Sequence, residues 1–227
     1  MTIEFTWYGH ATIGLQIDGI QLLVDPFFSG NPVASTTAAD VSADYILITH
    51  GHGDHVGDAV SIASRTGAPI ITNYEIAVWL DKQGVANTHA QHIGGGHRHP
   101  FGYLKFTPAL HGSALPDGSN GGNPCGFLLH AGDKRVYLAG DTGLFGDMAL
   151  IGAAGLDLAA LPIGDNYTMG PDDALQAVEF LAPAVAVPIH YNTFDLIAQD
   201  AAVWKARVEA GTNTAVQVLK PGESITV

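Results

Sequence analysis

The order of apolar segments in the first half of the chain recurs in the second half. A predicted hairpin that ends at Asp25 is matched, about 115 residues later, by one that ends at Asp141. The apolar strand predicted at 68–71 has its counterpart at 184–187, at the same spacing. Because short strands alternate with helical segments in both halves, this order favours an internal duplication. Two β-rich halves would stack as a sandwich with helices on its outer faces.

Hydrophobic periodicity and breaker residues define the expected elements. Strands are predicted at 3–8, 12–17, 21–25, 45–49, 69–72, 103–107, 126–130, 135–139, 156–163 and 184–189. Helices are predicted at 56–65, 74–82, 171–181 and 199–210. The Gly-rich stretch 94–96 and the segment 116–124 are predicted loops. Since no linker rich in Pro or Ser divides the chain, we expect residues 1–227 to form one domain of the α/β (α+β) class.

The charge balance narrows the class of partner. The chain of 227 residues carries 9 Lys and Arg against 22 Asp and Glu, for a formal net charge of −13. A protein that binds nucleic acid along the phosphate backbone needs a basic surface, so nucleic acid is a disfavoured partner. Hydrophobic residues make up 47% of the chain and charged residues only 14%, which suits a buried sheet with tight loops.

Cysteine usage and the N-terminal residues bear on the location of the protein. Cys125 is the single cysteine, which excludes an intrachain disulfide and fits a reducing cytoplasm. The first residues do not join a basic segment to an apolar one, as a signal peptide would. No apolar run approaches the roughly 18 residues of a membrane span. We therefore expect a cytoplasmic protein that has no membrane partner.

Histidines cluster directly after one predicted strand. Of the 11 histidines, three lie with an aspartate in the segment Thr49-His50-Gly51-His52-Gly53-Asp54-His55, which follows an apolar run. Loops at strand ends hold functional groups on a rigid scaffold, and glycines allow the sharp turns that let these side chains converge. Imidazole and carboxylate ligands suit Zn²⁺, Mn²⁺ or Fe²⁺, whereas the absence of thiolates disfavours a structural zinc or iron–sulfur site.

The motif His-x-His-x-Asp-His resembles that of the metallo-β-lactamase superfamily. The resemblance extends over nearly the whole chain through the segments Trp7-Tyr8-Gly9-His10-Ala11, Leu23-Val24-Asp25-Pro26, Leu138-Ala139-Gly140-Asp141-Thr142, Leu161-Pro162-Ile163-Gly164-Asp165, Thr168-Met169-Gly170-Pro171 and Pro188-Ile189-His190-Tyr191-Asn192-Thr193-Phe194. These segments are similar to a branch of bacterial and archaeal metal-dependent hydrolases of uncertain substrate, which is related to the ascorbate-6-phosphate lactonases. The resemblance implies a four-layer αββα sandwich with a two-metal site.

The resemblance also implies the ligands of two divalent ions per chain. Transferred position by position, they are His50, His52 and His111 for the first ion, Asp54, His55 and His190 for the second, and Asp141 as a bridge. Zn²⁺ is the expected metal, with Mn²⁺, Ni²⁺ and Fe²⁺ as alternatives. The ligands outside the motif each follow a predicted strand, so all seven side chains can meet at one edge of the sandwich.

Four further side chains are candidates for supporting or substrate-binding roles. Asp25 is expected to hold a ligand imidazole or the backbone of the metal loop, and a plain turn cap is its alternative. Thr49 is a second candidate for supporting a ligand. His10 is expected to approach the site from the first hairpin unless it is an ordinary histidine near the surface. Asp165 would bind substrate or support a ligand, and a loop role is equally open.

A second group of histidines lies at His89, His92, His97 and His99. This stretch is rich in glycine, and neither a strand nor a helix is predicted there that would fix the geometry of the imidazoles. We therefore expect these side chains to bind no metal, and we expect the replacement of His97 or His99 to leave metal binding unchanged.

Together these expectations describe a metal-dependent hydrolase that acts on a small-molecule ester or lactone, with or without a phosphate group. A metal-bridging hydroxide would be the nucleophile, since two divalent ions lower the pKa of a bridging water. Asp54 would orient this hydroxide and carry its proton to the leaving oxygen. Phosphodiester cleavage, including nuclease activity, and a non-catalytic metal-binding module stay open as alternatives. The native metal and the formation of a homo-oligomer stay open as well.

Overall fold

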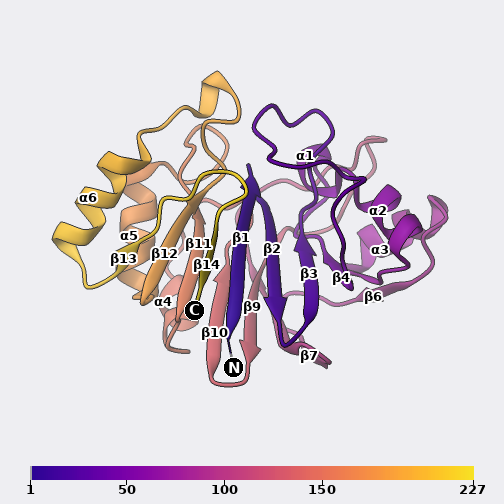
Figure 1. Cartoon of the computed structure of the whole chain (residues 1–227), viewed down its shortest axis with the longest axis horizontal. Coiled ribbons are helices and arrows are strands. Elements are labelled where there is room, and N and C mark those ends of the chain that lie inside the picture. The colour runs from indigo at the N-terminus through magenta and orange to yellow at the C-terminus, as the bar shows by residue number, and fades with distance from the viewer. Residues whose placement is uncertain (1) are drawn as a thin grey trace.

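The computed structural model describes residues 2–227 and contains two mixed β-sheets of seven strands each (Figure 1). The first sheet has the order β14-β1-β2-β3-β4-β5-β6. Its strands are β1 (Ile3–Gly9), β2 (Thr12–Ile17), β3 (Ile20–Val24), β4 (Tyr45–Leu47), β5 (Ile70–Thr72), β6 (Thr88–Ala90) and β14 (Ser224–Thr226). The second sheet has the order β13-β12-β11-β10-β9-β8-β7. Its strands are β7 (Gly96–His99), β8 (Gly102–Pro108), β9 (Cys125–Ala131), β10 (Lys134–Leu138), β11 (Leu158–Pro162), β12 (Val185–Ile189) and β13 (Ala215–Val216).

Both sheets are built by the same succession of strand pairs. In the first sheet, the strands from β14 through β3 pair antiparallel, and those from β3 through β6 pair parallel. In the second sheet, β7 through β10 pair antiparallel and β10 through β13 pair parallel. The hairpin β2–β3 thus corresponds to the hairpin β9–β10, and the expected duplication into two halves is confirmed.

Helices cover the outer faces of the two sheets. The first half contributes α2 (Ala59–Thr66) and α3 (Tyr74–Lys82), and the second contributes α4 (Met148–Gly152), α5 (Pro171–Leu181) and α6 (Ala201–Gly211). Figure 1 shows α2 and α3 at one side and α5 and α6 at the other, with both sheets between them. The four-layer αββα arrangement is therefore confirmed. No helix among residues 2–227 is both long and apolar enough to cross a membrane.

Two buried clusters hold these layers together. The larger one includes residues of both sheets, among them Phe5 of β1 and the neighbouring rings of Phe106 and Phe127, whose centroids are 5.0 Å apart. The smaller one joins the first sheet to its helices through residues such as Ile46 and Ile62. Because these side chains are fully buried, the strands form a rigid base for the loops at their ends.

The main difference from the sequence prediction concerns the stretch that carries the second group of histidines. This stretch was expected to contain neither strand nor helix, and that expectation is wrong, because His89 lies in β6 and His97 and His99 lie in β7. Strands of three and four residues are too short to show a periodicity in the sequence. They form because β6 pairs with β5 and β7 pairs with β8, so the tertiary structure supplies their hydrogen bonds.

Candidate metal centre

The structure brings all seven predicted ligands to loops that follow strands. The motif residues follow β4, and Asp54 and His55 lie within the short helix α1 (Gly53–Val56). His111, Asp141 and His190 follow β8, β10 and β12, so both sheets contribute to the site. Groups of potential ligand atoms within 4.8 Å of one another share members and thereby link all seven residues.

Two glycines allow these loops to approach one another closely. A Cβ atom on Gly51 would lie 3.1 Å from the carbonyl oxygen of Ser113, in the loop that follows His111. Gly140 has a φ of +63°, and a Cβ there would lie 2.9 Å from the carbonyl oxygen of Cys125. A side chain at either position would force these neighbouring backbone segments to shift.

Three imidazoles direct their nitrogens at one point. Nδ1 of His52 lies 3.0 Å from Nε2 of His50 and 3.2 Å from Nε2 of His111. Burial lowers the pKa of His50 well below its usual value, and burial also lowers the pKa of His111. Neutral imidazoles with converging lone pairs are the form in which histidine binds Zn²⁺ and similar ions.

Asp141 lies between this trio and the remaining ligands. Its carboxylate is 3% exposed, and Oδ2 lies 3.0 Å from Nε2 of His190, 3.4 Å from that of His55 and 3.5 Å from that of His111. Burial acts to raise the pKa of Asp141, but the charges of His190 and His55 outweigh it and lower the pKa well below its usual range. An ionised carboxylate in this position is placed to bridge two cations.

Asp54 is the predicted ligand with a partly exposed carboxylate, and the buried ring of His10 holds it. Nε2 of His10 lies 3.0 Å from Oδ2 of Asp54, while Nδ1 of His10 lies 2.8 Å from the hydroxyl of Thr193. Burial lowers the pKa of His10 to about 4, so the neutral ring donates its Nε2–H to the carboxylate and accepts from Thr193. Burial alone would raise the pKa of Asp54, but the bond to His10 and the charge of His55 lower it. The side chain of Asp54 is 34% exposed.

Asp25 and Thr49 orient two of the imidazoles from behind. Oδ2 of Asp25 accepts a hydrogen bond from Nδ1 of His55 at 2.8 Å and one from the hydroxyl of Thr49 at 2.6 Å. Since the Thr49 proton is directed at Asp25, the Thr49 oxygen accepts from Nδ1 of His50 at 3.0 Å. Both imidazoles therefore donate from Nδ1, which directs Nε2 at the centre, as in most metal-binding histidines.

The donor set fits bound cations. Within the described part of the chain, Nε2 of His55, Oδ1 of Asp141 and Nδ1 of His190 are buried and have no hydrogen-bond partner. Buried polar atoms are nearly always paired, so the unpaired atoms of His55 and Asp141 indicate a ligand that completes the site. Nδ1 of His190 does not add to this argument, because Nε2 is the nitrogen that faces Asp141. The pKa of His55 supports this interpretation: burial lowers it, but the carboxylates of Asp141 and Asp25 raise it well above the usual value, so the site attracts positive charge.

A cavity of about 220 Å³ opens above the centre. Its floor consists of predicted site residues, namely His10, His52, Asp54, His111, Asp141 and His190. Its wall consists of Tyr167, Phe194 and Ile197, which the sequence analysis missed. Tyr167 is 57% exposed and Phe194 45% exposed, so aromatic faces are free to contact a ligand. No local signal marked these residues, because they reach the cavity only through the folding of the loops after β11 and β12.

Asp165 is the one predicted candidate whose side chain contacts none of the predicted ligands in the described part of the chain. Its side chain is exposed and accepts a hydrogen bond from the backbone N–H of Asn166 at 2.8 Å. Asp165 is not among the described residues that line the cavity. This placement corresponds to the loop role that the sequence analysis left open, whereas His10, Asp25 and Thr49 all contact predicted ligands.

Comparisons with known proteins agree with this geometry. Residues 21–191 match the family described as Beta-lactamase superfamily domain. A UPF0173 metal-dependent hydrolase of Heliobacterium modesticaldum is 49% identical over 99% of this chain and 98% of its own length. One from Thermus thermophilus is 47% identical over 97% of both chains.

A solved structure is similar over the whole chain. Igni18, described as a novel metallo hydrolase from the archaeon Ignicoccus hospitalis, has 38% sequence identity and a TM-score of 0.91, and the match covers 100% of this chain and 99% of that one. The family match includes the seven predicted ligands, and the relatives and the solved structure cover nearly the whole chain. This chain therefore belongs to the metallo-β-lactamase superfamily and is a metal-dependent hydrolase of the UPF0173 group.

Proposed function

We propose that the centre binds two divalent ions and hydrolyses a small, uncharged ester or lactone. The observation that carries this proposal is the cavity, which joins a floor of metal-binding side chains to a wall of Tyr167, Phe194 and Ile197. Its volume of about 220 Å³ is below the roughly 300–1,000 Å³ of sites for drug-sized ligands. None of the described residues that line it is Lys or Arg, so no cationic side chain is available for a phosphate group.

The residues present fit two ions of the zinc class. His50, His52 and His111 would hold one ion, and Asp54, His55 and His190 the other, with Asp141 between them. Bound ions of this kind supply Lewis acidity, which polarises a substrate carbonyl and lowers the pKa of a water toward 7.

The chain itself would position the reactants and move the proton. Asp54 is the half-buried carboxylate on the floor of the cavity, so its free oxygen can take the proton of the attacking water and pass it to the leaving oxygen. His10 holds the other oxygen of Asp54 at 3.0 Å and thereby fixes the carboxylate for this role. Tyr167 and Phe194 would pack against the acyl part of the substrate and exclude water from it.

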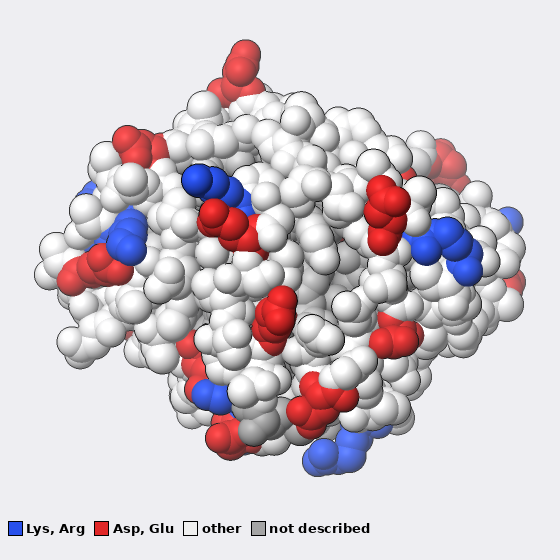
Figure 2. All heavy atoms as spheres, in the orientation of Figure 1, with Lys and Arg blue, Asp and Glu red and all other residues white. Residues whose placement is uncertain are grey.

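Two other activities have less support. Cleavage of phosphodiesters, above all in nucleic acid, is favoured by basic surfaces, but the net charge is −13. On the face in Figure 2, the few Lys and Arg side chains are scattered among Asp and Glu and form no continuous patch. A module that only binds metal would have no need of a cavity over its ligands or of an exposed carboxylate at its floor.

A substrate screen tests the proposal directly. The metal-loaded protein would be assayed with short-chain esters, lactones, phosphomonoesters and phosphodiesters. We expect the highest kcat/KM with an uncharged ester or lactone. A phosphodiester as the best substrate would contradict the choice of substrate class. Two bound ions without turnover of any of the four classes would instead favour the metal-binding module.

The variant Asp54→Asn tests the assigned proton transfer. Asn keeps an oxygen that can bind metal but cannot accept the proton, so we expect kcat to fall by about 10²–10⁴-fold while KM changes far less. The metal content must be measured in the same samples, so that lost metal is not mistaken for lost chemistry. Asp165→Asn is the matched comparison, because it makes the same change at a carboxylate outside the cavity. Full kcat in Asp54→Asn with both ions bound would remove Asp54 from this role.

A further inference from the structure

Three histidines meet at a point where the edges of the two sheets adjoin. His89 lies in β6, the edge strand of the first sheet, and His97 and His99 lie in β7, the edge strand of the second. The ring centroids are 4.5 Å apart for His89 and His97, 4.9 Å for His89 and His99, and 4.7 Å for His97 and His99. Figure 1 places β7 at the end of the sandwich opposite α1, so this cluster is separate from the centre described above.

The spacing of the nitrogens suits a single ion. Each imidazole offers one nitrogen that lies within 4.8 Å of those of the other two. Tetrahedral zinc with Zn–N bonds of about 2.0–2.1 Å holds its donors about 3.4 Å apart. Small rotations of exposed or half-buried rings are enough to close this difference.

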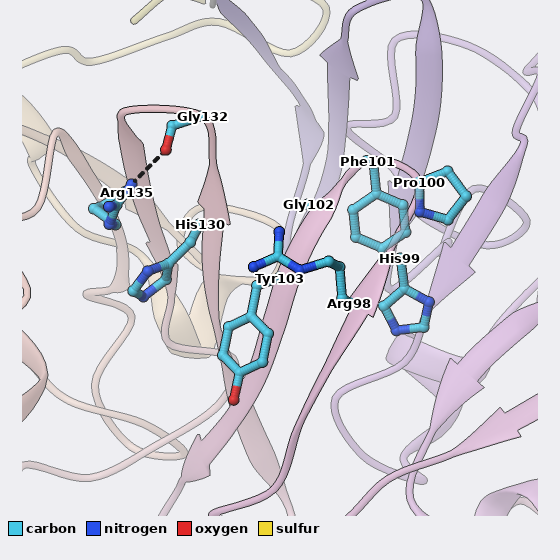
Figure 3. A pocket seen from close by; sticks show the side chains of 9 residues that line it. All are labelled: Arg98, His99, Pro100, Phe101, Gly102, Tyr103, His130, Gly132 and Arg135. Atoms are coloured by element: carbon cyan, nitrogen blue, oxygen red, sulfur yellow. Dashed lines mark hydrogen bonds between the residues drawn. The ribbon is translucent and has the colours of Figure 1, made fainter.

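Strand geometry keeps positive charge away from these rings. His97 and His99 are two residues apart in β7 and project to the same face, whereas Arg98 projects to the other. Figure 3 shows the guanidinium of Arg98 extending away from the ring of His99. Arg98 lines a hollow of about 610 Å³ together with His99, Tyr103, His130 and Arg135. Tyr103 lies opposite Arg98 in the neighbouring strand, so this charge sits on the face of β7 away from the side that His97 and His99 share.

His99 is already held in place by its neighbours. Its Nε2 donates a hydrogen bond to Oε1 of Gln91 at 3.1 Å, and Nε2 of Gln91 donates to the carbonyl oxygen of Leu104 at 3.2 Å. The ring also stacks on Phe101, with 5.0 Å between centroids and 5° between planes. This arrangement leaves the lone pair on Nδ1 of His99, and a fixed tautomer of this kind is typical of metal-binding histidines.

Contrary to the expectation from the sequence, we propose that His89, His97 and His99 bind one transition-metal ion, with water completing its coordination. Three imidazoles without a thiolate or carboxylate suit Zn²⁺, Ni²⁺ and Cu²⁺. The exposed position of His97 leaves the remaining coordination positions open to solvent. Because the ligands come from edge strands of different sheets, the ion joins the two sheets and stabilises the folded state. This ion is additional to any held at the centre that follows β4.

The experiment compares the zinc content of the full-length wild type, His97→Ala and His92→Ala. Each protein is saturated with Zn²⁺, freed of unbound metal by gel filtration and measured by elemental analysis. His97 is exposed, so its replacement leaves the fold intact. His92 lies in the same stretch, but its side chain is 60% exposed and it lies outside the cluster, which makes it the matched control. We expect His97→Ala to hold one ion fewer than the other two proteins.

The test depends on the difference of one bound Zn²⁺ ion between the wild type and His97→Ala, and not on the total number of ions that each protein holds. His52→Ala, which removes a ligand of the other centre, is expected to keep the ion at the sheet edges, so failure at one site is distinguishable from failure at the other. In proteins whose first centre is already loaded, further Zn²⁺ at about 100 times its dissociation constant should raise the Tm of the wild type by about 5–10 °C more than that of His97→Ala. Equal zinc content and equal Tm shifts in the wild type and His97→Ala would overturn the proposal.

Discussion

Replacing Asp25 with Asn is expected to weaken metal binding at the centre without touching a proposed ligand. The carboxylate of Asp25 is 1% exposed and accepts three hydrogen bonds. These come from the backbone N–H of Thr49 at 2.8 Å, the hydroxyl of Thr49 at 2.6 Å and Nδ1 of His55 at 2.8 Å. The amide of Asn has one acceptor atom in place of two, so it cannot satisfy all three donors.

The orientation of the new amide determines whether Asp25→Asn leaves two buried donors facing each other or changes the tautomer of His55. If its NH₂ group faced the N–H of Thr49, two donors would oppose each other in a buried position. The other orientation lets the NH₂ group donate to Nδ1 of His55, and the proton of His55 then moves to Nε2, 3.4 Å from Oδ2 of Asp141. In that state the proton on Nε2 faces the carboxylate of Asp141, and the lone pair of Nε2 is lost. Binding an ion must then reverse the tautomer and break the new bond.

The magnitude follows from the loss of one hydrogen bond, the one that Nδ1 of His55 donates to the charged carboxylate of Asp25. A hydrogen bond to a charged group contributes about 1.5–3 kcal/mol, and each 1.4 kcal/mol is a factor of ten in an equilibrium constant. We therefore expect Asp25→Asn to weaken the ion held by His55 by about 10–100-fold, a range also typical of lost partners of metal-binding histidines. Excess metal should restore most of the activity, because Asp25 does not line the cavity.

Competition with a chelator of known zinc affinity measures this effect. Asp44→Asn is the matched control, since Asp44 is exposed and its carboxylate accepts a hydrogen bond from the backbone of Gln21 rather than from a histidine. The control should bind zinc as the wild type does. If Asp25→Asn bound both ions within twofold of the wild-type affinity, the argument that Asp25 sets the tautomer of His55 would be refuted.

Two further predictions concern the scaffold. Phe106→Ala removes a fully buried ring that packs on Phe127, so we expect a loss of about 3–5 kcal/mol in the free energy of unfolding. The denaturant m-value should stay unchanged if both sheets still unfold together. A loss below 1 kcal/mol in urea titrations would show that the core between the sheets is not packed as described. Cys125 is fully buried, and burial together with the charge of Asp25 raises the pKa of its thiol well above the usual value, so the thiol stays protonated at pH 8 and should resist iodoacetamide until the protein is denatured. Mass spectrometry of the native protein tests this, and rapid alkylation would contradict the burial.

Short stretches of sequence determined two helices, the main group of ligands and the order of the strands. The helices at 74–82 and 171–181 have the predicted bounds, because caps and apolar spacing act over a few residues. The motif that begins at His50 places four predicted ligands within six residues after one strand, so their proximity needs no long-range contact. The duplicated order of strands likewise predicted the two-sheet architecture, since each half repeats the same local pattern.

Tertiary structure decided which distant residues join these local elements. Tyr167 and Phe194 form the cavity wall because the loops after β11 and β12 fold back over the centre, which no periodicity in the sequence reports. His89 meets His97 and His99 because two short edge strands adjoin, and their hydrogen bonds come from neighbouring strands. Such pairing depends on contacts between separate segments, so the sequence alone predicted no strand in the stretch that contains His89, His97 and His99. The residues within each short segment thus determined which side chains could bind metal, and the packing of the two sheets determined which other side chains lie beside them.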